Sequence, residues 1–240
     1  MFLARVFALL TTMTAIGVNA QPGDFQVVIQ KGTPTADVTG TELDAAKKVL
    51  AFLKGKIGGD EIQTLLADEI TAANTYWHQL LANSTGQWTP VEAQAKAVVD
   101  PSILNSQSFA EWMASAGNGY PNDLIAGHPE IYFEEEPGNV IQSWGGGPIT
   151  QFSHDPVDKQ PFMPDLPGWN VTATVSQTLR DNTTFSYAVS AIKEEADGFA
   201  IYFAVYLPSN VPKDRLVGLR NYLTIECTNW LKYAYQFTIK

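Results

Sequence analysis

The sequence predicts an α+β fold: an antiparallel sheet with helices gathered on one side and a long C-terminal helix lying across it. Three observations lead to this prediction. Helical patterns dominate the first half of the chain. Three strongly apolar runs separated by short turns follow, at residues 171–179, 185–193 and 199–207. Residues 211–240 then carry apolar side chains at spacings of three and four, the period of one helix face.

The N-terminus is typical of a secretory signal peptide over residues 1–20, with one basic residue, an apolar stretch and Ala20 at the expected cut. We therefore expect a single mature α+β domain over residues 21–240 that is secreted from the cell. No later stretch approaches the roughly 20 apolar residues of a membrane span, so we expect no integral membrane segment after cleavage. Three N-glycosylation sequons agree with secretion, at Asn83, Asn170 and Asn182.

Composition limits the partners and the redox chemistry. The 240 residues carry a net charge of −10 and are 45% hydrophobic, which suits one sizeable core. An acidic surface argues against nucleic acid and anionic membranes as partners. The single cysteine, Cys227, allows no intrachain disulfide and is expected to be a small buried hydrophobe.

The first half is predicted to be mainly helical. Residues 25–29 favour a first strand, and Gly58-Gly59 ends the helix that follows. Thr89-Pro90 resembles the start of another helix, a cap followed by a first-turn proline. The helices expected in this half are residues 41–57, 60–83, 89–99 and 106–116.

The second half is predicted to be mainly strands. An acidic turn joins residues 131–133 to 140–144 in a hairpin, and residues 149–152 continue the sheet. Residues 155–168 hold four prolines and are expected to form a long surface loop. Short turns connect the three apolar runs that follow, which predicts an antiparallel meander.

The C-terminal helix carries one acidic residue close to its apolar face. Glu226 lies roughly 60° from the centre of that face, and its neighbours on the helix are Tyr222, Trp230 and Tyr233. A carboxylate in this position is costly to bury unless it has a partner. The apolar face itself consists of Leu216, Leu219, Leu223, Cys227, Trp230, Ala234 and Phe237.

This outline suits a helix-grip fold of the Bet v 1/START type, and a cone-shaped fold of the nuclear-transport-factor type is the alternative. The space between sheet and helix in a helix-grip fold commonly holds an apolar small molecule. The aromatic residues expected to line it are Trp144, Tyr187, Phe203, Trp230 and Tyr233.

Two of the three histidines are predicted to lie at the mouth of such a cavity. His128 stands where helix gives way to sheet, and His154 ends a strand. With Glu226 they would supply two imidazoles and one carboxylate, a set that binds zinc and activates water. In the alternative, His128 caps a loop, His154 is solvated and Glu226 hydrogen-bonds to a tyrosine hydroxyl.

Three short motifs resemble the diacetylphloroglucinol/phloretin hydrolase family: Phe-Ala-Glu-Trp-Met at 109–113, His-Pro-Glu-Ile-Tyr at 128–132 and Leu-Thr-Ile-Glu at 223–226. The resemblance implies a Bet v 1-like fold, zinc held by His and Glu, and hydrolysis of a carbon–carbon bond in acyl-phloroglucinols. It assigns His128 and Glu226 as metal ligands.

The family pattern is altered at two places. Tyr222 stands four residues before Glu226, where the family has a histidine. The position of the second family glutamate is open between Gln142, His154 and Asp155, none of which is Glu.

Three functional hypotheses follow. In the first, a secreted hydrolase cleaves aryl ketones or acyl-phenolic molecules, with zinc on His128 and Glu226 and with Tyr222 donating a hydrogen bond to the substrate. In the second, a non-catalytic secreted protein binds an apolar or phenolic small molecule. In the third, a metal-free hydratase or isomerase of the cone fold uses His154 and Asp155 as its base.

Overall fold

The computed structural model describes residues 26–31, 49–50, 52–54, 56–116, 127–128, 130–135 and 139–239. The predicted signal peptide and most of the helix expected over residues 41–57 lie outside the described residues.

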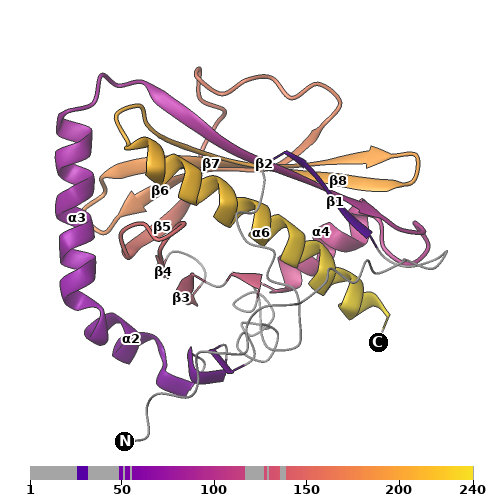
Figure 1. Cartoon of the computed structure of the whole chain (residues 1–240), viewed down its shortest axis with the longest axis horizontal. Coiled ribbons are helices and arrows are strands. Elements are labelled where there is room, and N and C mark those ends of the chain that lie inside the picture. The colour runs from indigo at the N-terminus through magenta and orange to yellow at the C-terminus, as the bar shows by residue number, and fades with distance from the viewer. Residues whose placement is uncertain are drawn as a thin grey trace, which may run out of the picture.

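One antiparallel sheet of eight strands dominates the fold, in the order β1-β2-β8-β7-β6-β5-β4-β3 (Figure 1). Its strands are β1 (Gln26–Lys31), β2 (Trp88–Val98), β3 (Ile131–Glu135), β4 (Asn139–Gln142), β5 (Thr150–Pro156), β6 (Asn170–Leu179), β7 (Thr184–Glu195) and β8 (Gly198–Pro208). Strands β3 to β8 follow one another in sequence and in space, as the meander prediction requires. The predicted hairpin of β3 with β4 and the three-strand meander of β6, β7 and β8 are confirmed.

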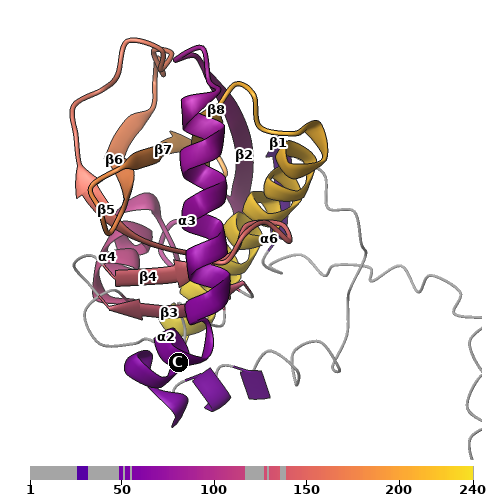
Figure 2. The same cartoon turned by 90° about the vertical axis from the view of Figure 1, so that its left-hand side faces the viewer.

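Four helices complete the described fold: α2 (Gly59–Leu65), α3 (Ala67–Ala82), α4 (Ser106–Ala116) and α6 (Lys213–Thr238). Helix α6 runs across one face of the sheet, and α3 stands at the side beside β4 and β5 (Figures 1 and 2). The predicted α+β class with a long C-terminal helix across the sheet is therefore confirmed, and the architecture is compatible with a helix-grip-like fold.

The predicted helix over residues 89–99 is wrong, because this segment is strand β2. Val91, Ala93, Ala95 and Ala97 are fully buried and alternate with less buried residues, which is the period of a strand. Pro90 pairs with Tyr206 of β8 on one side, whereas the described pairing of β2 with β1 ends at Gln94. The missing N–H of proline therefore interrupts no described hydrogen bond to β1.

The single helix expected over residues 60–83 is two helices that meet at Leu66. Asp60 lies in the first turn of α2, but the N-cap is Gly58, whose φ of 81° suits glycine. Ile70, Ala73 and Trp77 of the expected apolar face are buried. Leu65 of that face is 70% exposed, because the break at Leu66 rotates it away from the sheet.

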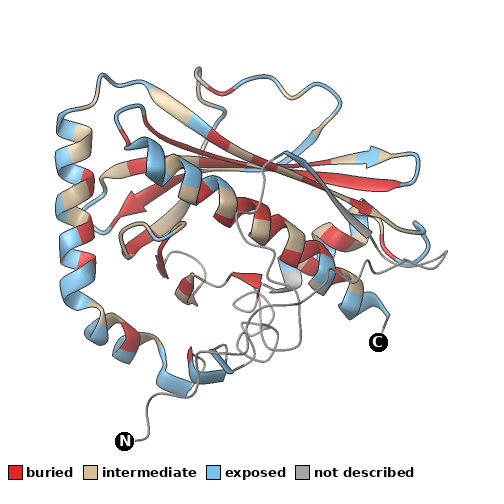
Figure 3. Ribbon diagram, viewed as in Figure 1, coloured by how far each residue is buried: buried red, intermediate tan, exposed pale blue. Residues whose placement is uncertain are grey.

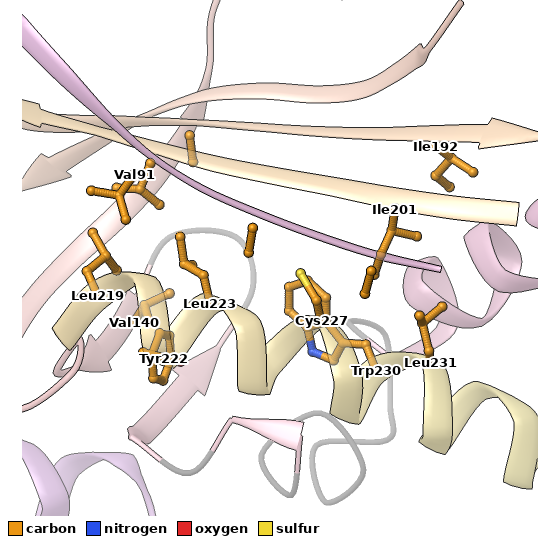
Figure 4. Close-up of a cluster of buried hydrophobic side chains, with 14 of the residues drawn as sticks. Val91, Val140, Ile192, Ile201, Leu219, Tyr222, Leu223, Cys227, Trp230 and Leu231 are labelled. Atoms are coloured by element: carbon orange, nitrogen blue, oxygen red, sulfur yellow. The ribbon is translucent and has the colours of Figure 1, made fainter. Parts of the chain in front are cut away.

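Helix α6 is held close to the sheet along its N-terminal half. Leu219, Leu223 and Cys227 point from α6 toward the sheet and Val91 (Figure 4). A Cβ atom added to Gly218 would collide with the carbonyl oxygen of Gly145, so these two glycines let α6 pass close to the turn between β4 and β5. The expected burial of Cys227 is confirmed, whereas Phe237 is 44% exposed near the end of the helix.

The opposite face of the sheet is covered by the loop between β5 and β6. The loop lies at the surface as expected, although Met163 in it is buried and packs in a cluster with Phe162 and Trp169. Figure 3 shows that buried residues are concentrated in the sheet and in the part of α6 that faces it. Tyr187 packs in this cluster against Trp88, with ring centroids 4.9 Å apart. The prediction that Tyr187 lines the inner cavity is therefore wrong.

The predicted sequon residues are all exposed: Asn83, Asn170 and Asn182. Asn182 has a φ of 67° in the turn between β6 and β7, a conformation that asparagine tolerates. Their glycosylation, and secretion itself, stay predictions.

Candidate functional site

A cavity of about 390 Å³ lies between the sheet and α6. Strands β4 to β8 form its walls, and α6 closes it with Tyr222, Leu223, Glu226 and Trp230. Most of the lining is apolar, including Trp144, Phe203 and Val205. Of the aromatic residues expected in the lining, Trp144, Phe203 and Trp230 are present, whereas Tyr233 is not among the lining residues.

A second, more apolar chamber of about 340 Å³ adjoins the first beneath α4. Met113, Phe203 and Trp230 line both chambers. Phe109 and Ile201 line only the second. The hollow therefore has a long apolar part and a shorter end where polar groups gather.

His128 anchors the polar end through both ring nitrogens. The indole of Trp230 donates a hydrogen bond to Nε2 of His128 over 2.9 Å. Because an indole N–H only donates, Nε2 must be the accepting nitrogen, and the ring proton then lies on Nδ1. Nδ1 contacts the Glu226 carboxylate, so His128 is a neutral imidazole that donates to Glu226.

Glu226 is 3% exposed and collects two donors on one oxygen. Its Oε1 accepts hydrogen bonds from His128 Nδ1 and from the Tyr222 hydroxyl, the latter over 3.0 Å. Within the described residues, no hydrogen bond reaches Oε2. The expected inward position of Glu226, opposite His128, is confirmed.

Tyr222 links the helix to the far edge of the sheet. Its hydroxyl accepts a hydrogen bond from the Gln142 side-chain amide of β4 over 2.8 Å and donates to Glu226. Burial, followed by the charge of Glu226, raises the pKa of Tyr222 well above its usual value, so the phenol stays protonated. The carboxylates of Glu130 and Glu134 act in the same direction.

Glu130 forms the layer behind this network. Its carboxylate accepts from the Ser143 hydroxyl at 3.1 Å and from the Gly146 backbone N–H at 3.2 Å. Burial raises the pKa of Glu130. Burial also lowers the pKa of Lys54 to about 8, and the negative charge of nearby Glu130 opposes part of that lowering.

His154 lines the cavity from β5 and is also held in one tautomer. The Ser186 hydroxyl donates to the Gln177 carbonyl oxygen, which turns the Gln177 amide N–H toward His154 Nε2 at 3.1 Å. Nε2 therefore accepts, and the proton lies on Nδ1. Burial lowers the pKa of His154 to about 4, so this ring is neutral at pH 7.

Asp155 lies on the other side of strand β5 from His154. It is exposed, and its carboxylate accepts from the Ser153 hydroxyl at 3.0 Å. Successive residues of a strand point to opposite faces, so neighbours in sequence do not share a site here. The structure thus brings His128, Tyr222 and Glu226 together and sets His154 on the cavity wall, while Asp155 is absent from the lining.

Gln142 and Gln177 are the polar residues whose roles the sequence did not specify. Each orients a partner, Tyr222 and His154 respectively, and both glutamines are buried. Gln142 ends the apolar run of β4, and a polar side chain in a buried strand is the one available sequence signal for it.

The donor set fits a zinc ion poorly. Zinc takes deprotonated thiolates, imidazoles and carboxylates, usually three or four of them. Here Trp230 occupies Nε2 of His128, the Tyr222 phenol keeps its proton, and Gln142 is a neutral amide. Among the described residues, no group of three His, Cys, Asp or Glu side chains is placed to hold a metal.

Comparison with known proteins finds no relative of this chain: no family profile, curated protein or solved structure matches it.

Among the described helices, including the 26 residues of α6, none is both long enough and apolar enough to span a bilayer.

Proposed function

We propose that this protein binds an apolar small molecule, carrying at least one hydrogen-bonding group, between the sheet and α6. One observation carries the proposal: the cavity of about 390 Å³ has apolar walls and hydrogen-bonding side chains at one end. Sites for small molecules have this size and this distribution of polarity. The likeness in outline to the Bet v 1 type of helix-grip fold points the same way.

The polar end is built for orientation of a ligand. His128, Tyr222 and Glu226 restrain one another through hydrogen bonds, so their side chains need no rearrangement when a ligand arrives. Preorganised groups lose little conformational entropy on binding. The apolar part of the ligand would extend along Phe203 toward the second chamber under α4.

Hydrolysis of an acyl-phenolic molecule is the second candidate. It is favoured by the convergence of Tyr222 and Glu226, two positions that the family resemblance selects. In this reaction Glu226 would take a proton from water as the water oxygen adds to the ketone carbon, while Tyr222 donates a hydrogen bond to the ketone oxygen. The bond between the ketone carbon and the ring would then break, with the proton passing from Glu226 to the ring carbon and a carboxylic acid as the second product. Secretion as a glycoprotein belongs to both candidates.

Binding is tested with N-phenyl-1-naphthylamine, an uncharged dye whose fluorescence rises in apolar surroundings. We expect saturable binding to the wild type at one site. Ala188→Leu fills the cavity from β7 and should abolish the rise, whereas Ala82→Leu adds the same bulk to the exposed end of α3 and should leave it unchanged. A wild type that gives no rise, or equal rises for the folded wild type and Ala188→Leu, contradicts the proposal.

Hydrolysis is tested separately by incubating the protein with an acyl-phloroglucinol and measuring release of phloroglucinol by chromatography. The second candidate predicts release that Glu226→Gln abolishes while dye binding persists. Binding of the dye without product would leave the protein as a binder alone.

A further inference from the structure

We infer that the natural ligand of this cavity is a cation, a protonated amine on an apolar body, whose ammonium group lies against Glu226. The inference rests on the proposed binding function and adds the charge of the ligand to it. It comes from the balance of charges around the cavity.

Among the described residues, the cavity lining carries negative charge without a lysine or arginine. Its charged side chains are Glu134 and Glu226, and no lysine or arginine is among the lining residues. Both histidines in the lining are neutral, because Nε2 of His128 accepts from Trp230 and Nε2 of His154 accepts from Gln177. Neither imidazole therefore offsets a carboxylate.

Glu226 is the residue that a cation would satisfy. Glu226 is 3% exposed, and its two hydrogen bonds come from neutral donors, His128 and Tyr222. A buried ionised carboxylate is costly without an opposite charge. Oε2 receives no hydrogen bond within the described part of the chain, which leaves one acceptor for a ligand.

The basic groups nearest to this end of the fold have other roles. Lys54 donates to the Ile131 carbonyl and interacts with Glu130, and its ammonium lies 5.3 Å from the ring centroid of Tyr132. Arg215 donates to the Gly146 carbonyl. Neither side chain is among the described lining residues, so a cationic ligand would bring the opposite charge into the cavity itself.

Aromatic walls add to the attraction for a cation. Trp144, Phe203 and Trp230 line the same chamber as Glu226. Indole and phenyl faces attract an ammonium group, most strongly where water is excluded. An anionic ligand would meet the carboxylates and the negative ring faces together, so a fatty acid or other carboxylate should be rejected.

The test uses three probes of one shape: 3-phenylpropylamine, 3-phenylpropan-1-ol and 3-phenylpropanoate. Isothermal titration of the full chain at pH 7.5 measures their affinities. We expect the amine to bind about tenfold or more tightly than the alcohol, because a hydrogen bond to a charged group gains more than a neutral one. The carboxylate should show no measurable binding.

Glu226→Gln separates charge from shape. We expect this variant to lose the preference for the amine and to bind the alcohol within about threefold of the wild type. Glu69→Gln, an exposed change on α3, is the matched control and should keep the preference. Circular dichroism establishes that each variant is folded, and if Glu226→Gln unfolds, the amine and alcohol affinities of the wild type decide alone.

The outcomes distinguish the inference from the function on which it rests. Equal affinities for amine and alcohol, or tighter binding of the carboxylate, overturn the cation inference and leave the binding function intact. The inference also fails if the neutral dye binds and the amine does not. Failure of all three probes together with the dye removes the binding function itself.

Discussion

The two faces of the sheet are both apolar, yet only one of them is filled. On the outer face, the loop between β5 and β6 inserts Phe162 among Trp88, Tyr187 and Tyr206, with ring centroids 5.3–5.6 Å apart. On the inner face, the same strands β7 and β8 border a hollow of about 390 Å³. Protein interiors are normally packed without such space.

The difference shows what separates a core from a binding site in this fold. Alternation along β8 sends Tyr206 outward and Val205 inward, so one strand supplies both surfaces. Apolar composition is therefore no guide to function. The inner face is distinguished by a buried carboxylate, Glu226, bonded only to neutral partners.

The largest expected effect is on the filled face. Met163→Ala should lower the free energy of unfolding by about 2–5 kcal/mol, since Met163 is 5% exposed and its removal leaves a void. Met113 borders the inner cavity, so Met113→Ala should lower the free energy of unfolding clearly less than Met163→Ala. Urea denaturation measures both, and equal losses would mean that the inner hollow is in fact packed.

The inner face should respond to acid through His154. Its pKa is about 4 when folded and near 6.5 in the unfolded chain, so the unfolded state takes up the proton first. Stability from this group is complete above pH 6.5 and is lost as the pH falls toward 4, by up to roughly 3 kcal/mol.

The His154 contribution is isolated by comparing thermal unfolding of wild type and His154→Gln between pH 7 and pH 4. The variant should lose less stability over this range. His78→Gln, at an exposed histidine that pairs with Asp181 at 2.8 Å, controls for loss of any histidine. Parallel pH curves for wild type and His154→Gln would contradict the buried neutral ring.

A smaller effect is expected from Tyr222→Phe, which removes one hydroxyl from the network. Glu226 keeps only His128 as a donor, and the Gln142 amide loses its acceptor, so the free energy of unfolding should fall by about 1–3 kcal/mol. Tyr76→Phe, on α3, should be nearly neutral. A neutral Tyr222→Phe would show that the network does not form.

The smallest expected effect is that of metal removal. Because the donor set fits zinc poorly, EDTA should leave the melting temperature unchanged, and metal analysis of the purified protein should find much less than one zinc per chain. Stoichiometric zinc that is lost in both His128→Ala and Glu226→Gln would instead support the metal-dependent hydrolase.

Sequence periodicity predicted much of the fold, but it failed at a segment whose structure depends on pairing with neighbouring strands. The three runs of β6, β7 and β8 are bounded by short turns and were placed correctly. Strand β2 was not, because its alanines at 93, 95 and 97 favour helix locally, and only pairing with β1 and β8 makes them a strand.

The candidate site was predictable in part. The helical period alone turns Glu226 inward, and the buried carboxylate then required a partner. The contact of Gln142 with Tyr222 depends on the curvature of the sheet, which brings β4 back to α6, and no local pattern encodes it. The inward or outward direction of Tyr187 likewise depends on which face of β7 the helix covers.

A crystal structure of the protein soaked with 3-phenylpropylamine would show directly whether a cation binds beside Glu226. We expect density for one molecule between the sheet and α6, with its ammonium nitrogen within about 3 Å of Glu226 Oε2 and its ring toward Phe203. Side chains that fill the hollow, or a Glu226 carboxylate turned out to solvent, would contradict it.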